Sequence, residues 1–199
     1  MQVIGVCGGS GSGKSEVCRL FSELGIPSID TDALYHGMIS GPGELNRALA
    51  ERFGAGILDE NGALVRGRLA EIVFAKGAEA ELADLNRISH YFILNGVRER
   101  LSKLSADGYF AALVDAPLLF ESGFDRECDA LLCVTAPKEM RIQRIVDRDK
   151  ISRERAEARI ASQKSDEYLL RRCGYHIENA GDTLALQARV EEIARAIKK

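Results

Sequence analysis

The sequence predicts a three-layer α/β fold, with helices on both faces of a parallel sheet. Short apolar runs alternate with helical stretches along the 199 residues, and the clearest runs end at Gly or Pro. Such runs are typical of strands that are buried on both faces. Strands separated by helices favour a parallel sheet, whose ligands bind beyond the carboxyl ends of the strands. We therefore expect the functional residues in the loops that follow the strands.

Five segments are expected to form the sheet: residues 2–7, 26–30, 111–115, 130–135 and 175–178. The last helix is marked by Leu186, Val190, Ile193 and Ile197, whose spacings of four, three and four place them on one helix face. Asp182 or Thr183 is its expected N-cap. This apolar face is predicted to pack on the sheet.

Two segments are longer than a minimal connection between strands requires. Residues 33–107 form a mostly helical insert, which includes a long helix marked by Leu82, Leu85, Phe92, Val97, Leu101 and Leu104. Residues 141–172 are rich in arginine and are expected to form one or two exposed helices that act as a lid. Because no repeat or low-complexity linker separates these parts, residues 1–199 are interpreted as one domain with an acceptor-side insert and a lid.

The composition is that of an ordinary globular protein, with 46% hydrophobic and 29% charged residues. The net charge of −3 gives no overall attraction to nucleic acid or anionic lipid, which favours a small-molecule substrate. No apolar run approaches the 18 residues of a membrane span, and the first residues lack the pattern of a signal peptide. We expect a cytoplasmic protein that acts as a monomer, although the sequence leaves an oligomer open.

The five cysteines are scattered and form no C-x-x-C pair that would suggest zinc or a redox motif. We expect all five to be reduced thiols that serve as small apolar residues on buried strands and helices: Cys7, Cys18, Cys128, Cys133 and Cys173.

The strongest motif is a phosphate-binding loop of the pattern G-x-x-x-x-G-K-[ST], formed by Gly8, Gly9, Ser10, Gly11, Ser12, Gly13, Lys14 and Ser15. It follows a predicted strand and opens a predicted helix. Glycines let the backbone direct its N–H groups at phosphate oxygens, and the helix N-terminus adds positive potential. We expect Lys14 to reach the β and γ phosphates of ATP and Ser15 to ligate Mg²⁺. The fold is therefore expected to be of the P-loop NTPase type.

Two carboxylates, Asp30 and Asp32, follow the second predicted strand. A carboxylate aimed at an acceptor hydroxyl can orient that group and take its proton during phosphoryl transfer. Asp32 is the candidate catalytic base. The alternative is that Asp30 or Asp32 caps the following helix.

Further acidic residues follow the third predicted strand. Asp115 ends the strand and is a candidate ligand of Mg²⁺ or of a water in its shell, although a strand-end aspartate can be purely structural. Glu121, six residues later, is a candidate for binding the acceptor, with a solvated or capping role as the alternative.

The predicted lid carries Arg141, Arg144 and Arg148 at helical spacing, with Arg153, Arg155 and Arg159 beyond them. Arginines on a lid can close over phosphates and neutralise charge in the transition state. Arg144 and Arg148 share a face and are the preferred candidates for contacts with ATP. The alternative is a solvated helix face paired with Glu154 and Glu157.

Taken together, these motifs resemble the dephospho-CoA kinase family of P-loop kinases. The matching elements are Val3–Ser15, the D-x-D at Asp30 and Asp32, the D-x-P-L-L-F-E run from Asp115 to Glu121, Arg144 and Arg148, the run Ala158–Gln163, and Asn179. The resemblance implies ATP-dependent phosphorylation of the ribose 3′-hydroxyl of dephospho-CoA, the last step of coenzyme A synthesis.

The resemblance also implies roles for individual residues. Asp32 would be the base, and Lys14, Ser15 and Arg144 would act at the phosphates. Glu16 is also a candidate for binding ATP, although the family commonly has a hydroxyl residue at this position. Leu118, within the D-x-P-L-L-F-E run, and His90 would line the acceptor side. His90 departs from the family pattern because Tyr91 follows it instead of proline, and a histidine on a helix surface is the alternative.

Two other functions remain open on the sequence. The first is another P-loop kinase for a small molecule or a nucleotide, because fold-level similarity does not fix the acceptor. The second is a nucleotide-dependent switch that hydrolyses ATP slowly, which has no need for a carboxylate at Asp32. The chain has no Asn-Lys-x-Asp box for guanine, which disfavours a GTPase switch.

Overall fold

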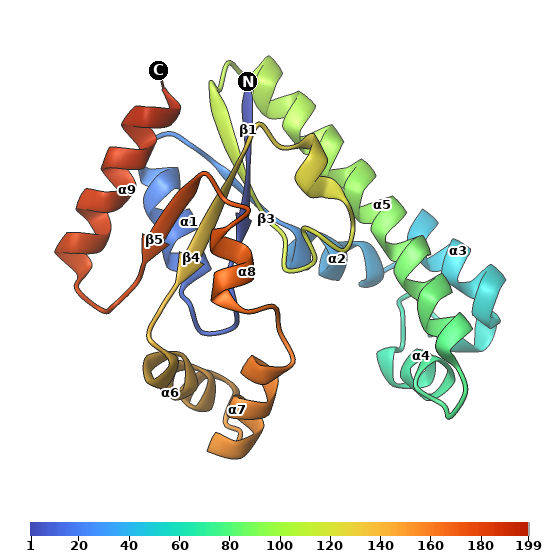
Figure 1. Ribbon diagram of the computed structural model, residues 1–199. Coiled ribbons are helices and arrows are strands. Elements are labelled where there is room, and N and C mark those ends of the chain that lie inside the picture. The colour runs from blue at the N-terminus through green and yellow to red at the C-terminus, as the bar shows by residue number, and fades with distance from the viewer. Residues whose placement is uncertain (199) are drawn as a thin grey trace. The chain divides into compact units, whose positions relative to one another are not determined.

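The computed structural model describes residues 1–198 and contains a five-stranded parallel sheet (Figure 1). The strands are β1 (Gln2–Cys7), β2 (Ser28–Asp30), β3 (Ala111–Asp115), β4 (Ala130–Thr135) and β5 (Tyr175–Glu178), in the spatial order β2-β3-β1-β4-β5. All neighbouring strands pair in parallel. The predicted α/β fold with a parallel sheet is confirmed, and the loop after β1 therefore lies at the middle of the sheet's carboxyl edge.

The second strand is two residues shorter than predicted, because it begins at Ser28 instead of residue 26. Pro27 has no backbone N–H to donate, although its carbonyl oxygen accepts a hydrogen bond from the Leu113 N–H at 2.8 Å. Ile26 is fully buried in the core beneath the sheet. The apolar pattern thus correctly predicts that this segment is buried, whereas the proline determines where strand hydrogen bonding begins.

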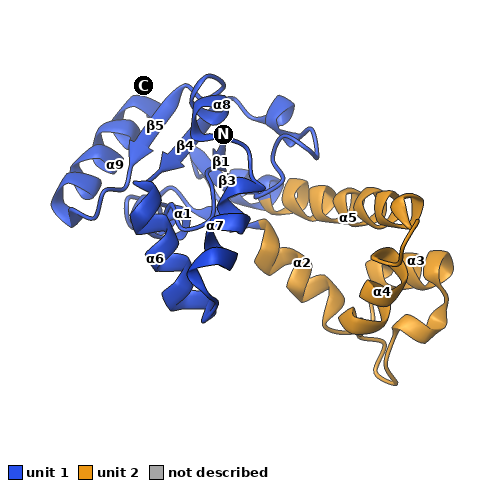
Figure 2. Cartoon of the chain, turned by 60° about the horizontal axis from the view of Figure 1, so that its bottom comes forward, with its two compact units in different colours: residues 1–30, 101–199 blue, residues 31–100 orange. Residues whose placement is uncertain are grey.

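The chain divides into two compact units (Figure 2). Unit 1 comprises residues 1–30 and 101–199 and contains the sheet, and unit 2 comprises residues 31–100. Unit 2 spans most of the segment 33–107 that the sequence marks as a helical insert. The assignment of residues 1–199 to one domain with an acceptor-side insert stays a prediction.

Two helices pack on one face of the sheet in unit 1: α1 (Lys14–Glu23) and α9 (Thr183–Ile197). The core between them and the sheet includes Phe21 and the predicted apolar positions of α9, Leu186, Val190, Ile193 and Ile197. Asp182 is the N-cap of α9, since its carboxylate accepts the N–H groups of Leu184 and Ala185 at 2.9 and 3.1 Å. The prediction for this helix is confirmed.

Unit 2 is helical and has a core of its own. It contains α2 (Thr31–Ile39), α3 (Glu44–Phe53), the short η1 (Ala55–Ile57), α4 (Arg66–Val73) and most of α5 (Glu79–Ala106). Buried residues of the first four elements pack with Leu82, Leu85 and Phe92 of α5. The long helix predicted from these apolar positions is confirmed.

The segment 141–172 was predicted to form one or two helices, but three helices of unit 1 cover it: α6 (Lys138–Asp149), α7 (Arg153–Ala161) and α8 (Asp166–Leu170). Its role as a lid stays a prediction. Ile142 and Ile145 of α6 pack with Ala156 of α7 in a small core. The short helix η2 (Phe124–Glu127) precedes β4. Across residues 1–198, no helix combines the length and the apolar character needed to cross a membrane.

Candidate active site

The phosphate-binding loop connects β1 to α1, as predicted. Gly11 and Gly13 have φ angles of 76° and 91°, a region of backbone conformation that favours glycine. Lys14 is the first residue of α1, and its ammonium donates a hydrogen bond to the Gly8 carbonyl oxygen at 3.0 Å. The loop therefore closes on its own lysine, with the N-terminus of α1 at its end.

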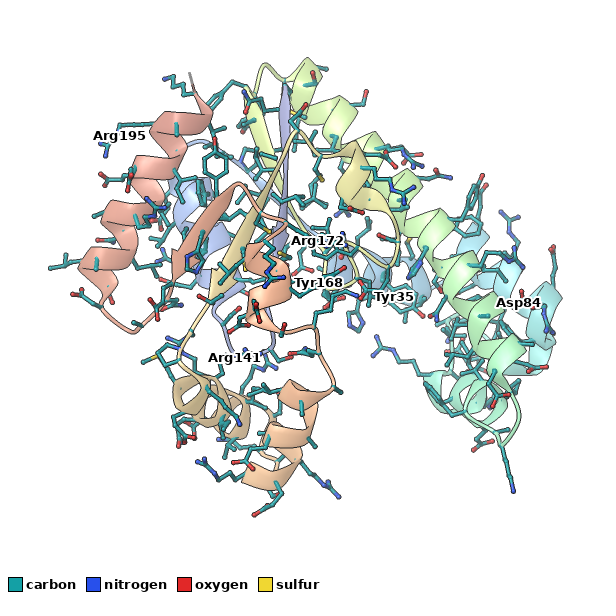
Figure 3. All side chains as sticks on the ribbon, viewed as in Figure 1. Tyr35, Asp84, Arg141, Tyr168, Arg172 and Arg195 are labelled. Atoms are coloured by element: carbon teal, nitrogen blue, oxygen red, sulfur yellow. The ribbon has the colours of Figure 1, made fainter. Side chains whose placement is uncertain are left out.

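Arg141 of α6 is hydrogen-bonded to the backbone of this loop. It is only 5% exposed, and its Nε donates to the Ser10 carbonyl oxygen at 3.0 Å (Figure 3). Its Nη1 donates to both carboxylate oxygens of Asp166, at 3.1 and 3.3 Å. A Cβ added to Gly11 would lie 2.6 Å from the Arg141 carbonyl oxygen, so a side chain cannot fit there. The loop and α6 thus form one closely packed assembly.

Arg144, one turn further along α6, bonds to the same loop. Its Nη1 donates to the Gly11 and Ser12 carbonyl oxygens at 3.1 and 3.4 Å. Its Nη2 donates to the side-chain oxygen of Asn179 at 3.1 Å, just beyond β5. Arg144 therefore contacts the phosphate loop directly. The contact of Arg144 with ATP stays a prediction.

Sequence reasoning did not assign site roles to Gln163 and Asn179, which contact the loop or its arginines. Gln163 accepts the Ser10 N–H at 2.9 Å and donates to the Ser10 hydroxyl at 2.9 Å. Both residues lie in segments that carry the family resemblance, the run Ala158–Gln163 and the single position 179. The family resemblance therefore marked both positions. The linear sequence could not show that they contact a loop more than 150 positions away.

Two carboxylates meet at the carboxyl edge of the sheet. Asp30 and Asp115 are register partners at the ends of β2 and β3, and Asp115 is also opposite Val6 of β1. Burial raises the pKa of the nearby Cys18 thiol to about 12, with Asp115 and Asp30 adding to the rise and Lys14 opposing it. The two carboxylates and the loop lysine therefore act on one buried thiol, which places them in a common electrostatic environment.

Asp32 lies in the first turn of α2, two residues after the end of β2. It is exposed, and among residues 1–198 its carboxylate has no hydrogen-bond or ion-pair partner. A carboxylate in the first turn of a helix is favoured by the positive end of the helix dipole. Its position and exposure are those of a group that can meet an external hydroxyl.

A cleft of about 310 Å³ lies beside the loop in unit 1. Its walls include Gly8 and Gly9, the D-x-P-L-L-F-E run from Pro117 to Glu121, and the segment Ser162–Lys164. Leu118 is 48% exposed there, and Glu121 forms an ion pair with Lys164 at 2.7 Å. Predicted acceptor residues thus lie along a hollow that reaches the phosphate loop.

Aromatic rings and cations extend the rim of this cleft. Phe120 meets Tyr168 of α8 edge to face, with ring centroids 5.9 Å apart. The Arg172 guanidinium lies 4.6 Å from the Tyr168 ring centroid and 5.5 Å from that of Phe120 (Figure 3). Such cation–aromatic contacts help to fix the arrangement of these side chains.

Two residues predicted to bind the nucleotide have other partners. Arg148 pairs with Asp149 at 2.7 Å and is 63% exposed. Glu16 pairs with Arg19 at 2.7 Å, one turn along α1. Contacts of Arg148 and Glu16 with ATP stay predictions, and neither side chain is shown bonding to the loop.

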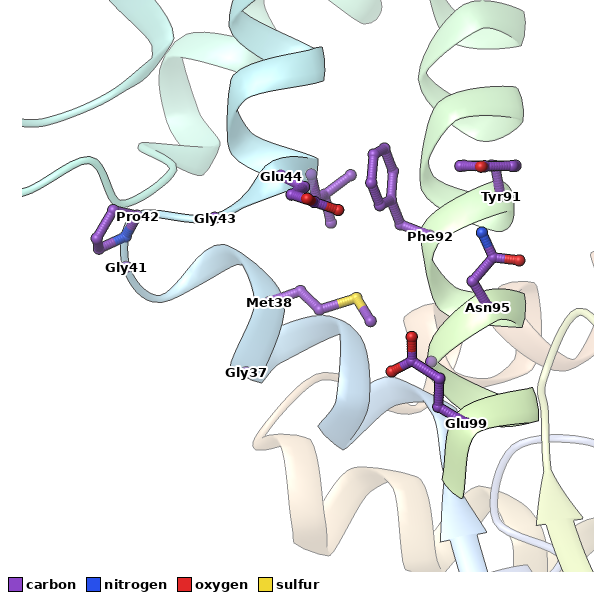
Figure 4. Close-up of a pocket in the computed structure, with 12 residues that line it drawn as sticks. Gly37, Met38, Gly41, Pro42, Gly43, Glu44, Tyr91, Phe92, Asn95 and Glu99 are labelled. Carbon is purple, nitrogen blue, oxygen red and sulfur yellow. The ribbon is translucent and has the colours of Figure 1, made fainter. Parts of the chain in front are cut away.

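Unit 2 contains a larger hollow of about 550 Å³ (Figure 4). It is bounded by Met38 of α2, by the turn Gly41–Glu44 and by Tyr91, Phe92, Asn95 and Glu99 of α5. His90 is half-buried on α5, next to this wall. Its predicted part in acceptor binding is untested by this geometry.

The comparisons with known proteins agree on one family. The family model described as dephospho-CoA kinase matches residues 2–185. A dephospho-CoA kinase of Fusobacterium nucleatum is 36% identical over 99% of both chains, and one of Syntrophotalea carbinolica is 40% identical over 91% of this chain and 85% of that protein. The solved dephospho-CoA kinase from Campylobacter jejuni has 27% identity and a TM-score of 0.71, covering 99% of this chain and 98% of its own. With its phosphate loop, strand-end carboxylates and loop-bound arginines, the chain belongs to the dephospho-CoA kinase family.

Proposed function

We propose that the chain transfers the γ-phosphoryl group of ATP to the ribose 3′-hydroxyl of dephospho-CoA, giving coenzyme A and ADP in the last step of coenzyme A synthesis. The observation that carries this proposal is the Gly8–Ser15 loop at the carboxyl edge of the sheet, within a chain that matches the family over residues 2–185. Membership of a kinase family implies a nucleotide donor.

The donor half of the reaction belongs to the loop and α6. A bound triphosphate would accept hydrogen bonds from backbone N–H groups of the loop and from the Lys14 ammonium. On binding, Lys14 would donate to phosphate oxygens in place of the Gly8 carbonyl oxygen. Arg144 donates to the Gly11 and Ser12 carbonyl oxygens and would turn to the phosphates when a nucleotide binds. Fixed donors of this kind stabilise the charge that spreads over the transferring group.

The chain also offers oxygen ligands that suit Mg²⁺. The Ser15 hydroxyl is exposed in the first turn of α1, and the Asp115 carboxylate ends β3, the strand paired with β1. Hydroxyl and carboxylate oxygens are the ligands that this hard cation prefers. Bound Mg²⁺ would supply neutralisation of the phosphate charge, while Ser15 and Asp115 would hold it.

Asp32 is the proposed base for the acceptor half. Its carboxylate is exposed, and within residues 1–198 it has no partner that would compete for the hydroxyl proton. It would orient the ribose 3′-hydroxyl and accept its proton as the bond to phosphorus forms. The helical insert would contribute the rest of the acceptor side, and the segment 141–172 would close as a lid to exclude water.

The proposal is tested by mixing the protein with Mg-ATP and a panel of acceptors while ADP is measured. Stimulation by dephospho-CoA, with the phosphate found on the ribose 3′-oxygen, supports it. Stimulation by a different alcohol instead would assign another small-molecule kinase, and ADP release that no acceptor changes would assign the nucleotide switch. Size-exclusion chromatography in the same buffer measures the expected monomer.

The role of Asp32 is tested separately. Asp32→Asn should lower turnover by about 10²–10⁴-fold, the range for a positioned base, and leave Mg-ATP affinity nearly unchanged. Asp107→Asn, at an exposed aspartate in the turn after α5, is the matched control. Near-normal turnover of Asp32→Asn would exclude Asp32 as the base without affecting the assignment of the substrate.

A further inference from the structure

Three cysteines that lie far apart in the sequence meet in unit 1. Cys7 ends β1, Cys133 lies in β4, and Cys173 is two residues before β5. Cys7 and Cys133 are register partners on neighbouring strands, so their side chains point to the same face of the sheet. The Cys7 and Cys173 sulfurs are 3.4 Å apart, and all three sulfurs lie within 4.8 Å of one another. We call these residues the thiol cluster.

The thiol cluster is largely buried. Cys7 and Cys133 are 4% and 0% exposed, whereas Cys173 is half-buried. Hydrogen bonds from the thiols of Cys133 and Cys7 hold the pKa of Cys173 well below its ordinary value, although burial opposes this. The pKa of Cys7 is raised, chiefly by its hydrogen bonds to the other two thiols. Three sulfurs from separate segments thus lie together at a largely buried site.

The spacing of the sulfurs fits a metal ion. A tetrahedral zinc ion with Zn–S bonds of about 2.3 Å requires sulfurs about 3.8 Å apart. The Cys7 and Cys173 sulfurs are 3.4 Å apart, slightly less than this value, and no pair of the three is more than 4.8 Å apart. Small side-chain rotations would therefore bring three sulfurs to one ion and leave a fourth position for water.

The two other cysteines show what an ordinary buried thiol looks like in this chain. The pKa of Cys128 is raised to about 12, first by burial and then by Asp125 and Asp129. Cys18 likewise has a pKa of about 12, raised first by burial. Both thiols have their pKa raised by nearby carboxylates, and within the described residues neither belongs to a group of three metal-ligating side chains. They serve as internal controls.

We propose that Cys7, Cys133 and Cys173 form a three-thiolate site for one soft metal ion such as Zn²⁺. On binding, the thiols that still carry protons release them to solvent and each sulfur forms one bond to the ion, with no change of oxidation state. Soft thiolate ligands select Zn²⁺ and similar thiophilic ions over Mg²⁺. The site is thus chemically separate from the hard oxygen ligands expected to hold the catalytic cation.

Occupation of this site would reach the phosphate loop through Cys7. The next residue is Gly8, whose carbonyl oxygen accepts the Lys14 ammonium at 3.0 Å. A Cβ at Gly8 would overlap the Val134 carbonyl oxygen, so this position has little room to move independently of β4. A metal bond at Cys7 would restrain the entry to the loop and so change nucleotide affinity, a consequence that rests on the proposed function.

The test uses the full-length protein, reduced with a phosphine and freed of metal. Equilibrium dialysis with Zn²⁺, and Cd²⁺ titration followed by its ultraviolet sulfur-to-metal absorption, should each give one ion per chain. Because loss of an outer partner of a metal ligand already costs about 10–100-fold in affinity, Cys173→Ser should cost at least about 100-fold. Cys128→Ser should bind the metal as the unchanged protein does.

Two further measurements cover a failure of Cys173→Ser to fold, which circular dichroism would detect. In the unchanged protein, Zn²⁺ should slow alkylation of Cys173 at least about tenfold, since a thiolate bound to metal is no longer free to react, and leave Cys128 unaffected. Cys133→Ala should lose the cadmium absorption.

Several results would overturn the site: no binding by the reduced protein, equal binding after loss of Cys173, or formation of a Cys7–Cys173 disulfide under mild oxidation with no metal binding in the reduced state. Metal binding without any effect on Mg-ATP affinity would remove the coupling to Gly8. Because metal binding is measured without turnover, failure of the kinase assay leaves this test intact.

Discussion

Arginines in the segment 141–159 have two kinds of partner. Arg141 and Arg144 donate to backbone carbonyls of the phosphate loop. Arg148, Arg153 and Arg159 instead pair with acidic side chains of α6 and α7. The first pair couples α6 to the loop, whereas Arg153 and Arg159 join α7 to α6 and Arg148 pairs within α6. Residue type alone therefore does not identify a phosphate-binding arginine, and its partner in the resting protein is more informative.

The sharpest test of this contrast is Arg144→Ala. Loss of one fixed donor near the transferring phosphate should lower turnover by about 10²–10³-fold. Steady-state assays with Mg-ATP and dephospho-CoA measure it, with Arg148→Ala as the control from the same helix. Equal activity of the two variants would contradict the distinction between arginines that bond to the loop and arginines that pair with acidic side chains.

Arg141→Met should act on stability more than on chemistry. It leaves the Ser10 carbonyl oxygen and Asp166 without their buried partner, at a cost of about 1–3 kcal/mol for an unsatisfied group. For a chain of this size the melting temperature should fall by roughly 3–10 °C. Calorimetry of this variant beside Arg148→Met provides the comparison. An unchanged melting temperature would mean that Arg141 does not anchor the loop.

Arg148→Ala should have little effect. Exposed ion pairs contribute about 0–1 kcal/mol, so the free energy of unfolding should change by no more than about 0.5 kcal/mol. Turnover should stay within about twofold, since only larger changes report a lost transition-state contact. Urea unfolding and the kinase assay check both values. A large loss of ATP affinity would instead support the sequence-based prediction that Arg148 binds the nucleotide.

The smallest expected effect depends on pH. Arg148 and then Arg159 lower the pKa of Asp149 from 3.8 to about 2. Because the folded-state pKa is depressed, the stabilisation is present above about pH 4 and is lost as the pH falls toward 2. Asp149→Asn should flatten the melting temperature over that window, and Asp107→Asn should not. Parallel curves for Asp149→Asn and the unchanged protein would contradict this assignment.

The strands were predictable because their residues are buried on both faces. Runs such as Ala111–Asp115 and Ala130–Thr135 read as strands from composition and from the residues that end them, and the structure confirms both. The glycine pattern of the phosphate loop was equally readable, since its backbone conformation restricts which residues can occupy it. The strands and the phosphate loop were predictable because residues close together in the sequence determine their backbone conformation.

The roles of the arginines required the tertiary structure. Helical spacing puts Arg141, Arg144 and Arg148 toward one side of α6, but it does not say how far the loop extends along that helix. At 1.5 Å per residue, Arg148 lies about 10 Å beyond Arg141. Asp149 then pairs with it instead. Position along the helix, and not only its face, decides which arginine contacts the loop.

The thiol cluster was also out of reach of the sequence. The cysteines were expected to be separate apolar residues, and their spacing of 126 and 40 positions in the chain carries no ligand pattern. They meet because β1 pairs with β4 in a register that aligns Cys7 with Cys133, and because the chain before β5 returns to the same face. Strand register is a long-range property that no local window contains.

The bond between the Lys14 ammonium and the Gly8 carbonyl has a consequence for how readily the resting enzyme accepts an anion. Without a nucleotide, the ammonium is bonded to an uncharged backbone carbonyl of its own loop. An arriving phosphate displaces an uncharged acceptor, so most of the Coulomb attraction counts toward association. Had a carboxylate held this place, the anion would first have had to break an ion pair, and the net gain would have been far smaller.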